Sequence, residues 1–176
     1  MGYPVGESSG VSVERAGVLD AEEILALQQL AYLSEAELYD EYTIPPLVET
    51  LEEIRREFAR TCFLKAVVNG RIVGSVRACA KDGTCHIGRL IVHPEYQNRG
   101  LGARLMRAIE NAFGSCRRFE LFTGHRSAKN LYLYGKLGYT VCGERRITDR
   151  LRLVYLAKER PQGGEDRSPA GPAAPR

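Results

Sequence analysis

The sequence predicts a single α/β domain built on a mixed β-sheet. Apolar strand-like runs alternate with amphipathic stretches, an Asn-Gly pair joins two β-rich runs, and a helix separates later strands. A tight hairpin joins antiparallel strands, whereas a helical crossover joins parallel ones, so the central sheet is expected to contain both directions. A chain of 176 residues is long enough to form one such domain with its own core.

The first half of the chain predicts a strand at 11–16, two helices and a hairpin. Two residue pairs spaced three apart resemble capping boxes, which satisfy the first free amides of a helix. These pairs are Asp20 with Glu23 and Thr50 with Glu53. Pro45-Pro46 is expected to break the chain between the two helices. Asn69-Gly70 predicts the hairpin turn, because both central positions of that turn need a positive φ.

The second half predicts strands and helices in turn. The expected strands are 85–92, 117–123, 139–147 and 150–158, and the expected helices are 99–113 and 127–137. The whole order gives a central sheet of six to seven strands flanked by about four helices. The folded domain is expected to span 10–160. Residues 1–9 are expected to be flexible, and the proline-rich tail 161–176 to be disordered because it offers no large apolar side chain.

Composition narrows the class of protein. The chain has no run of eighteen apolar residues and no signal-like N-terminus, which predicts a cytoplasmic protein that does not contact membranes. Five scattered cysteines favour buried thiols over a disulfide framework. With three histidines and no C-x-x-C pair, no metal site is expected. The basic residues are not interleaved with aromatic residues in one patch, so nucleic-acid binding is not expected either.

Charge is distributed unevenly along the chain. Residues 1–60 hold 13 acidic and 4 basic side chains, whereas 61–176 hold 9 acidic and 21 basic ones. One interpretation is a bipolar site, with a basic half for a polyanionic cofactor and an acidic half for a cationic substrate. The other is two solvated faces of opposite charge.

The segment Gln97-Asn98-Arg99-Gly100-Leu101-Gly102 follows a strand and opens an amphipathic helix. Its glycines let backbone amides approach a phosphate, and the helix N-terminus adds unpaired donors and a favourable dipole. A dinucleotide-binding turn is the competing interpretation, since Gly100-Leu101-Gly102 is G-x-G and Glu120 follows. Leu105 at the third glycine position and the preceding hairpin argue against it.

Two blocks of sequence resemble the GNAT superfamily of N-acetyltransferases. QNRGLG matches the family signature Q/R-x-x-G-x-G/A, and the lead-in at 90–96 matches as well. NLYLYGKLGY at 130–139 resembles a second family block in the expected order and spacing. The resemblance extends more weakly over 11–158 and implies the GNAT fold, with a V-shaped splay between the strands at 85–92 and 117–123.

The resemblance also implies how acetyl-CoA, a co-substrate, is held. Backbone groups of one strand would pair with the pantetheine arm, and amides of the following loop would hold the pyrophosphate. The residues implied are Leu90, Ile91, Val92, Gln97, Asn98, Arg99, Gly100, Leu101, Gly102, Ala103 and Asn130. At Ser127 the family more often has the asparagine that contacts the cofactor.

For catalysis, the resemblance places Tyr134 at the general-acid position, where it would protonate the departing thiolate; the alternative is a packing role. Several family members carry a glutamate base where this chain has His86. Imidazole has a suitable pKa for that role. His86, Glu120 on the adjacent strand, and a water relay remain open as the base.

The resemblance places acceptor selection in Tyr32–Tyr42, whose four carboxylates and three tyrosines suit a cationic amine of a small molecule or peptide. A solvated surface segment is the alternative. The expected function is direct transfer of an acetyl group from acetyl-CoA to a primary amine. A non-catalytic acetyl-CoA-binding domain is the alternative, and a homodimer is possible, because the family often pairs through its C-terminal strands.

Overall fold

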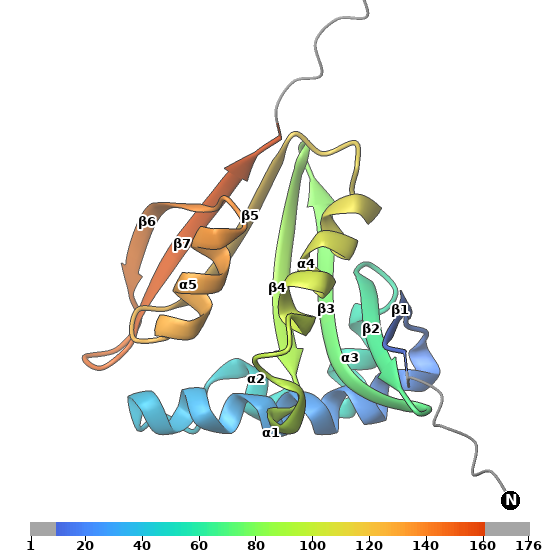
Figure 1. Ribbon diagram of the computed structural model, residues 1–176. Helices are drawn as coiled ribbons and strands as arrows, with labels where there is room; N and C mark the ends of the chain where they lie inside the picture. Colours follow the sequence, from blue (N-terminus) through green and yellow to red (C-terminus); the bar gives the residue numbers. More distant parts are fainter. Residues whose placement is uncertain (1–9, 161–176) are drawn as a thin grey trace, which may run out of the picture.

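The computed structural model describes residues 10–160, so the expectations for 1–9 and 161–176 lie outside the described residues. Seven strands form one sheet in the order β1-β2-β3-β4-β5-β7-β6 (Figure 1). The strands are β1 (Ser12–Arg15), β2 (Cys62–Val68), β3 (Arg71–Lys81), β4 (Thr84–Val92), β5 (Arg118–Gly124), β6 (Thr140–Arg146) and β7 (Arg152–Glu159). Among the strands of residues 10–160, only β4 and β5 pair in parallel, which confirms the mixed sheet.

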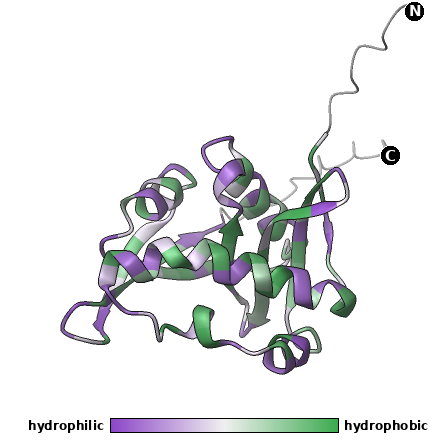
Figure 2. Cartoon of the chain, turned by 90° about the horizontal axis from the view of Figure 1, so that it is seen from below, coloured by the Kyte–Doolittle hydropathy of each residue, from purple (hydrophilic) through white to green (hydrophobic). Residues whose placement is uncertain are grey.

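Five helices cover the sheet. They are α1 (Ala21–Tyr39), α2 (Pro45–Val48), α3 (Leu51–Glu57), α4 (Leu101–Ala112) and α5 (Ala128–Lys136). Viewed from below, α4 and α5 lie on one side, α2 and α3 lie on the other, and α1 crosses between them (Figure 2). Pro45 and Pro46 lie between α1 and α3, as expected, and they also begin the short α2. Proline suits the first turn because the missing N–H would have no helical acceptor.

The two predicted capping boxes have different outcomes. Thr50 caps α3, since its hydroxyl accepts the Glu53 amide at 3.2 Å and the Glu53 carboxylate accepts the Thr50 amide at 2.7 Å. The prediction of a capping box at Asp20 and Glu23 is wrong, because the Asp20 side chain caps no amide of α1. Asp20 instead binds the Lys65 ammonium at 2.9 Å, and Glu23 accepts the Ile72 amide at 2.8 Å. Both carboxylates are therefore used to fasten α1 to the sheet.

The hairpin prediction is confirmed. Asn69 and Gly70 join β2 to β3 with φ of 50° and 76°. The pairing of β3 with β4 is irregular at one point. Ser75 lies opposite Ile91, but Arg77, two residues further along β3, lies opposite Gly88, three residues back along β4. The jump leaves one extra residue on β4, which is a β-bulge.

The sheet consists of two halves with a narrow junction. β4 and β5 pair only at Thr84–His86 opposite Arg118–Glu120, and beyond these residues they diverge (Figure 1). Helix α4 buries side chains that belong to a core shared by both halves; among them are Leu105, Met106 and Ile109, each 0% exposed. The predicted V-shaped splay is thus present, with α4 packed on the same side as α5.

The strand order and the antiparallel pairing of β4 with β3 exclude the dinucleotide-binding alternative, whose sheet is parallel. All five cysteines are free; Cys85 and Cys116 are buried, whereas Cys142 is exposed. Burial raises the pKa of the Cys85 thiol to about 12. Among residues 10–160, no helix is both long and apolar enough to span a bilayer.

Candidate active site

The opening of the V exposes the backbone of β4. The His93 amide donates to the Val73 carbonyl at 2.8 Å, so the backbone groups of His93 face β3. Because backbone groups alternate along a strand, those of Ile91 also face β3, whereas those of Leu90 and Val92 face the gap. Of the three residues predicted to pair with a pantetheine arm, Leu90 and Val92 therefore have backbone groups that face the gap.

A cluster of free amides lies at the mouth of this gap. The backbone amides of six consecutive residues, Asn98 to Ala103, donate no hydrogen bond to any described residue. Asn98 and Gly100 have φ of 59° and 76° and alternate with Arg99, an arrangement that turns successive amides toward one point. Gly100 is the N-cap of α4, so the positive end of the helix dipole adds to the cluster. We call residues 97–103 the amide cradle.

Side chains shape the surroundings of the amide cradle. Gln97 donates to the Val92 carbonyl at 3.2 Å and accepts from Lys129 of α5 at 3.3 Å, which holds the cradle against both strand and helix. A hollow of about 180 Å³ beside the cradle has an open, basic lining. Its lining residues are Val11, Val68, Tyr96, Arg99, Gly100, Leu101 and Arg104. The arrangement fits a ligand with several negative charges.

Tyr134 projects from α5 and is 6% exposed. Its ring packs edge-on against Tyr139, with ring centroids 6.1 Å apart, and its hydroxyl makes no hydrogen bond to a described residue. Burial raises the pKa of the Tyr134 phenol, and the nearby Tyr32 and Glu35 raise it further. The phenol therefore keeps its proton through the neutral pH range, as a proton donor must.

The two candidate bases meet where the strands begin to separate. His86 and Glu120 are opposite each other in the β4–β5 register, and His86 Nδ1 is 3.7 Å from the Glu120 carboxylate. Glu120 also binds Arg118 Nε at 2.6 Å. His86 and Glu120 thus form a pair at this position, and both remain predictions for the base.

The remaining predicted contact, Asn130, donates to the Thr123 hydroxyl at 3.2 Å and so lies between α5 and β5. Ser127, the alternative position, is buried and donates to the Glu35 carboxylate of α1 at 2.6 Å. Asn130 therefore faces β5, and Ser127 is already engaged by α1.

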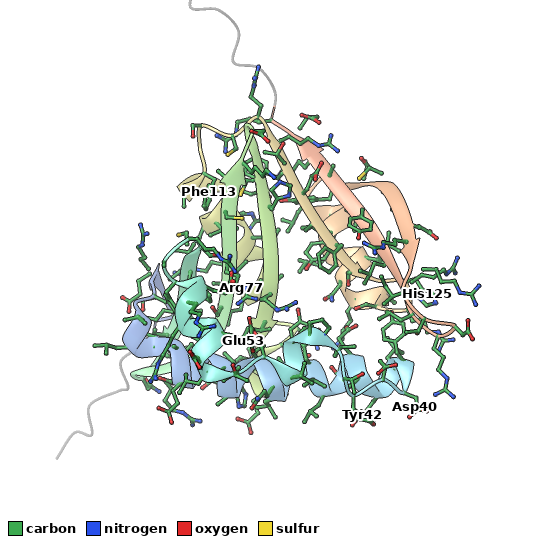
Figure 3. The ribbon with its side chains drawn as sticks, turned by 180° about the vertical axis from the view of Figure 1, so that it is seen from behind. Asp40, Tyr42, Glu53, Arg77, Phe113 and His125 are labelled. Atoms are coloured by element: carbon green, nitrogen blue, oxygen red, sulfur yellow. The ribbon has the colours of Figure 1, made fainter. Side chains whose placement is uncertain are left out.

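Helix α1 crosses the splay and contacts both halves (Figure 1). Its first turns pack on β3 and β4 through Ile24 and Leu27, and its last turn reaches the loop after β5. There the Tyr39 hydroxyl accepts the Arg126 amide at 2.6 Å, and the Tyr39 ring lies 5.5 Å from that of His125. Figure 3 shows His125 beside the C-terminal end of α1, close to Asp40.

The predicted acceptor segment is mostly helical, because Tyr32 to Tyr39 form the second half of α1. Of its four carboxylates, Asp40 pairs with Arg150 and Glu41 accepts from Thr43, both at exposed positions. Glu37 is exposed to solvent. Glu35 is the carboxylate of this segment that lies beside Tyr134 and Ser127.

One residue of this region was missed in the sequence, namely Arg89 of β4. It occupies the bulge with a φ of 51° and places its guanidinium 6.0 Å from the ring centroid of Tyr32. A signal was present, because Arg89 interrupts the apolar run of its strand. No group of three or more His, Cys, Asp or Glu side chains in the described part of the chain is arranged to hold a metal ion.

Comparison with curated proteins finds a relative that matches part of this chain. The UPF0157 protein YqkA of Bacillus subtilis strain 168 is 29% identical over 119 residues, which are 68% of this chain and 34% of that protein. The chain thus matches about a third of the length of that relative.

Solved structures share the fold. The ribosomal-protein-S18-alanine N-acetyltransferase of Escherichia coli superimposes with a TM-score of 0.70 at 18% identity, covering 89% of this chain and 98% of that one. The yncA protein of Salmonella typhimurium, solved with its cofactor acetyl-CoA, gives a TM-score of 0.67 at 21% identity over 85% and 93% of the two chains.

The family model for the acetyltransferase (GNAT) family matches residues 24–139. The match includes most of α1, the whole of β4, the amide cradle and Tyr134. Since it covers well over half of the 176 residues, this chain belongs to the acetyltransferase (GNAT) family.

Proposed function

We propose that this acyltransferase-family protein transfers an acetyl group from acetyl-CoA directly to a primary amine. The observation that carries the proposal is the amide cradle, six amides without acceptors among the described residues, placed at the mouth of a splayed strand pair. A diphosphate linkage matches such a cradle, because each amide donates to an oxygen and the helix dipole favours the charge.

The donor would lie along β4. Amides of residues 98–103, with Arg99 and Arg104 nearby, would hold the pyrophosphate. The backbone groups of Leu90 and Val92 that face the gap would pair with the pantetheine arm, much as a neighbouring strand would. An amide of β4 aimed at the thioester oxygen would stabilise negative charge as the amine attacks.

Two proton movements complete the transfer. As the amine nitrogen bonds to the acyl carbon and the carbon–sulfur bond breaks, Tyr134 gives its phenolic proton to the sulfur. Burial keeps the Tyr134 phenol protonated until the sulfur takes its proton. His86, oriented by Glu120, is the candidate to remove the proton from the amine, directly or through water.

The acceptor would enter from the side of α1. Glu35 supports this route, because it is the carboxylate nearest to Tyr134 on that helix and attracts an ammonium group. A cationic amine of a small molecule or peptide fits the acidic first part of the chain.

The test combines binding with turnover. Calorimetry measures acetyl-CoA binding, and thiol release is then followed in the same sample with a panel of primary amines. Binding with amine-dependent thiol release supports the transferase. Binding without release on a broad panel favours a non-catalytic acetyl-CoA sensor, and absence of binding removes the basis of the proposal.

A further inference from the structure

Arg89 lies where β4 has already left β5. The last β4–β5 pair is His86 with Glu120, three residues earlier. The bulge on β4 holds Arg89 in the left-handed region at a φ of 51°. This conformation costs a non-glycine residue roughly 1–2 kcal/mol, so the surrounding structure must enforce it. It aims the side chain at α1, where the guanidinium lies over the Tyr32 ring.

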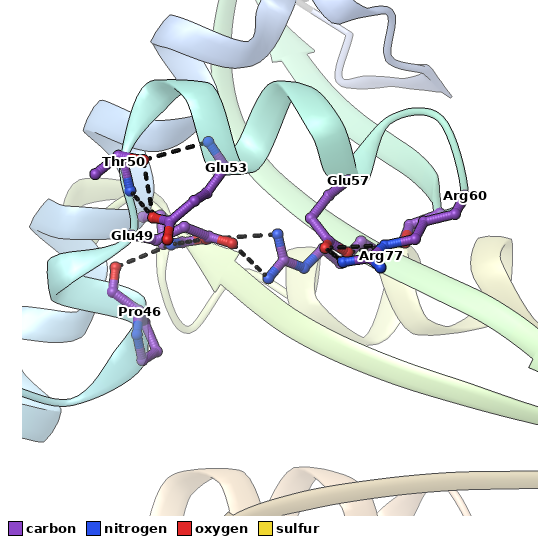
Figure 4. Close-up of polar contacts among 9 residues, drawn as sticks. Pro46, Glu49, Thr50, Glu53, Glu57, Arg60 and Arg77 are labelled. Atoms are coloured by element: carbon purple, nitrogen blue, oxygen red, sulfur yellow. Dashed lines mark hydrogen bonds and ion pairs between the residues drawn. The ribbon is translucent and has the colours of Figure 1, made fainter.

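The charge of Arg89 has no counter-ion within residues 10–160. Its Nε is buried and makes no hydrogen bond. Among the described residues, no other buried side-chain nitrogen or oxygen lacks a hydrogen-bond partner. Arg77, on the neighbouring strand, differs sharply. Its guanidinium binds Glu49 at 3.0 Å, and Gln28 donates to the same carboxylate at 2.7 Å (Figure 4).

The contrast between the two arginines points to a ligand. Buried donors are almost always paired, so the unpaired Nε of this half-buried arginine calls for a reason. Tyr32 offers its ring and its hydroxyl to the guanidinium, yet Nε remains without a partner. A planar guanidinium with free donors matches a carboxylate, which it binds through two parallel hydrogen bonds.

A negative group faces the same space from α1. Glu35 follows Tyr32 by three residues, so both side chains lie on one face of the helix. The Glu35 carboxylate accepts from Ser127 of the loop before α5 at 2.6 Å, and its charge raises the pKa of both the Tyr32 and the Tyr134 phenols. The space between α1 and β4 therefore offers a cation from the strand and an anion from the helix.

We propose that the acceptor is an amine that also carries a carboxylate, as a free amino acid does, and that Arg89 binds this carboxylate. Glu35 then holds the ammonium end near Tyr134. This inference rests on the proposed function, and it narrows the acceptor class from primary amines to zwitterionic ones.

Turnover on matched acceptors tests the proposal. The common L-amino acids are compared with their carboxamides, in which the amine is kept and the negative charge is lost. The wild type is expected to favour the acids by about 10- to 100-fold in kcat/KM, as loss of a charge-assisted bidentate contact implies. In Arg89→Gln this ratio falls to about one. Arg89→Lys, which keeps the charge without the fork, retains an intermediate preference.

Arg146→Gln is the matched control, because it removes the same charge from an exposed pair with Asp149. Its ratio should equal that of the wild type. Equal use of acids and carboxamides by the wild type overturns the inference while leaving the proposed function intact.

If no amine supports thiol release, the proposed function fails, and binding then decides the role of Arg89. In CoA-saturated protein, the same amino acids should raise the Tm of the wild type and not that of Arg89→Gln. The carboxamides should raise neither. Equal shifts in the wild type and the variant, or no shift with any acid, overturn the inference.

Discussion

Replacing Tyr134 with phenylalanine removes one O–H group and little else. The ring keeps its packing against Tyr139, and the lost hydroxyl bonds to no described residue. Its removal should therefore change the free energy of unfolding by less than about 1 kcal/mol. If the phenol protonates the departing thiolate, kcat should fall by about 10²- to 10⁴-fold. This fall corresponds to roughly 3–5 kcal/mol of activation free energy.

Thiol release at saturating acetyl-CoA measures kcat, and calorimetry measures the Kd for acetyl-CoA, which should stay unchanged in Tyr134→Phe. Tyr132→Phe is the matched control, because Tyr132 lies on the same helix and is 69% exposed. A kcat for Tyr134→Phe within twofold of the wild type would refute the assignment of Tyr134 as the acid.

The pH dependence follows from the direction of the shift. The folded pKa of Tyr134 is raised above its ordinary value of 10.0, first by burial. Its protonated form is therefore fully present below pH 10 and is lost only as the pH rises through the raised value. Between about pH 6 and pH 9, titration of this phenol should leave the rate unchanged, and any limb in the profile belongs to another group.

Three further predictions concern the amide cradle, the ion pair of Glu110 in α4 and the cap of α3. Gly100→Val places a β-branched residue at a φ of 76°, which should move the amides of the cradle and weaken CoA binding, measured by calorimetry, by at least about 10-fold. Gly100→Asn, which tolerates this φ, should bind CoA within about threefold of the wild type. Lys158→Met leaves the buried Glu110 without its 2.8 Å cationic partner and should lower the free energy of unfolding in urea by about 2 kcal/mol, a loss that adding Glu110→Gln should largely reverse. The Thr50 amide and hydroxyl hold the pKa of Glu53 below its ordinary 4.5, so the stability gained is full above that pH and is lost as pH falls through the depressed value. Thr50→Ala should therefore lower Tm at neutral pH and flatten its acid-side decline, and an unchanged decline would contradict this assignment.

Local signals in the sequence were enough for much of the fold. Asn69-Gly70 fixes its hairpin because its own backbone preferences demand positive φ, and the cradle segment opens α4 because its glycines and helix start are adjacent in sequence. In both places the determining residues lie within a few positions of one another.

Features that depend on residues far apart in the chain could not be predicted from the sequence. Asp20 resembles an N-cap, yet its carboxylate is taken by Lys65, 45 residues further along the chain. The bulge at Arg89 exists only because β3 and β4 change register, which one strand alone cannot indicate. Tertiary contacts therefore override local capping and register preferences, and the acceptor side of the site is where this matters most.

The narrow junction between β4 and β5 makes the chain separable. Three residue pairs and the exposed turn at Gly114-Ser115 connect the two halves of the sheet, whereas the buried face of α4 and the contacts of α1 with the loop after β5 hold them together without a covalent bond. A cut at that turn leaves the amide cradle and Arg89 on one fragment and Tyr134 on the other. Neither fragment alone contains a complete site, so recovery of acetyl transfer on mixing would report the reassembly of the protein from its two pieces.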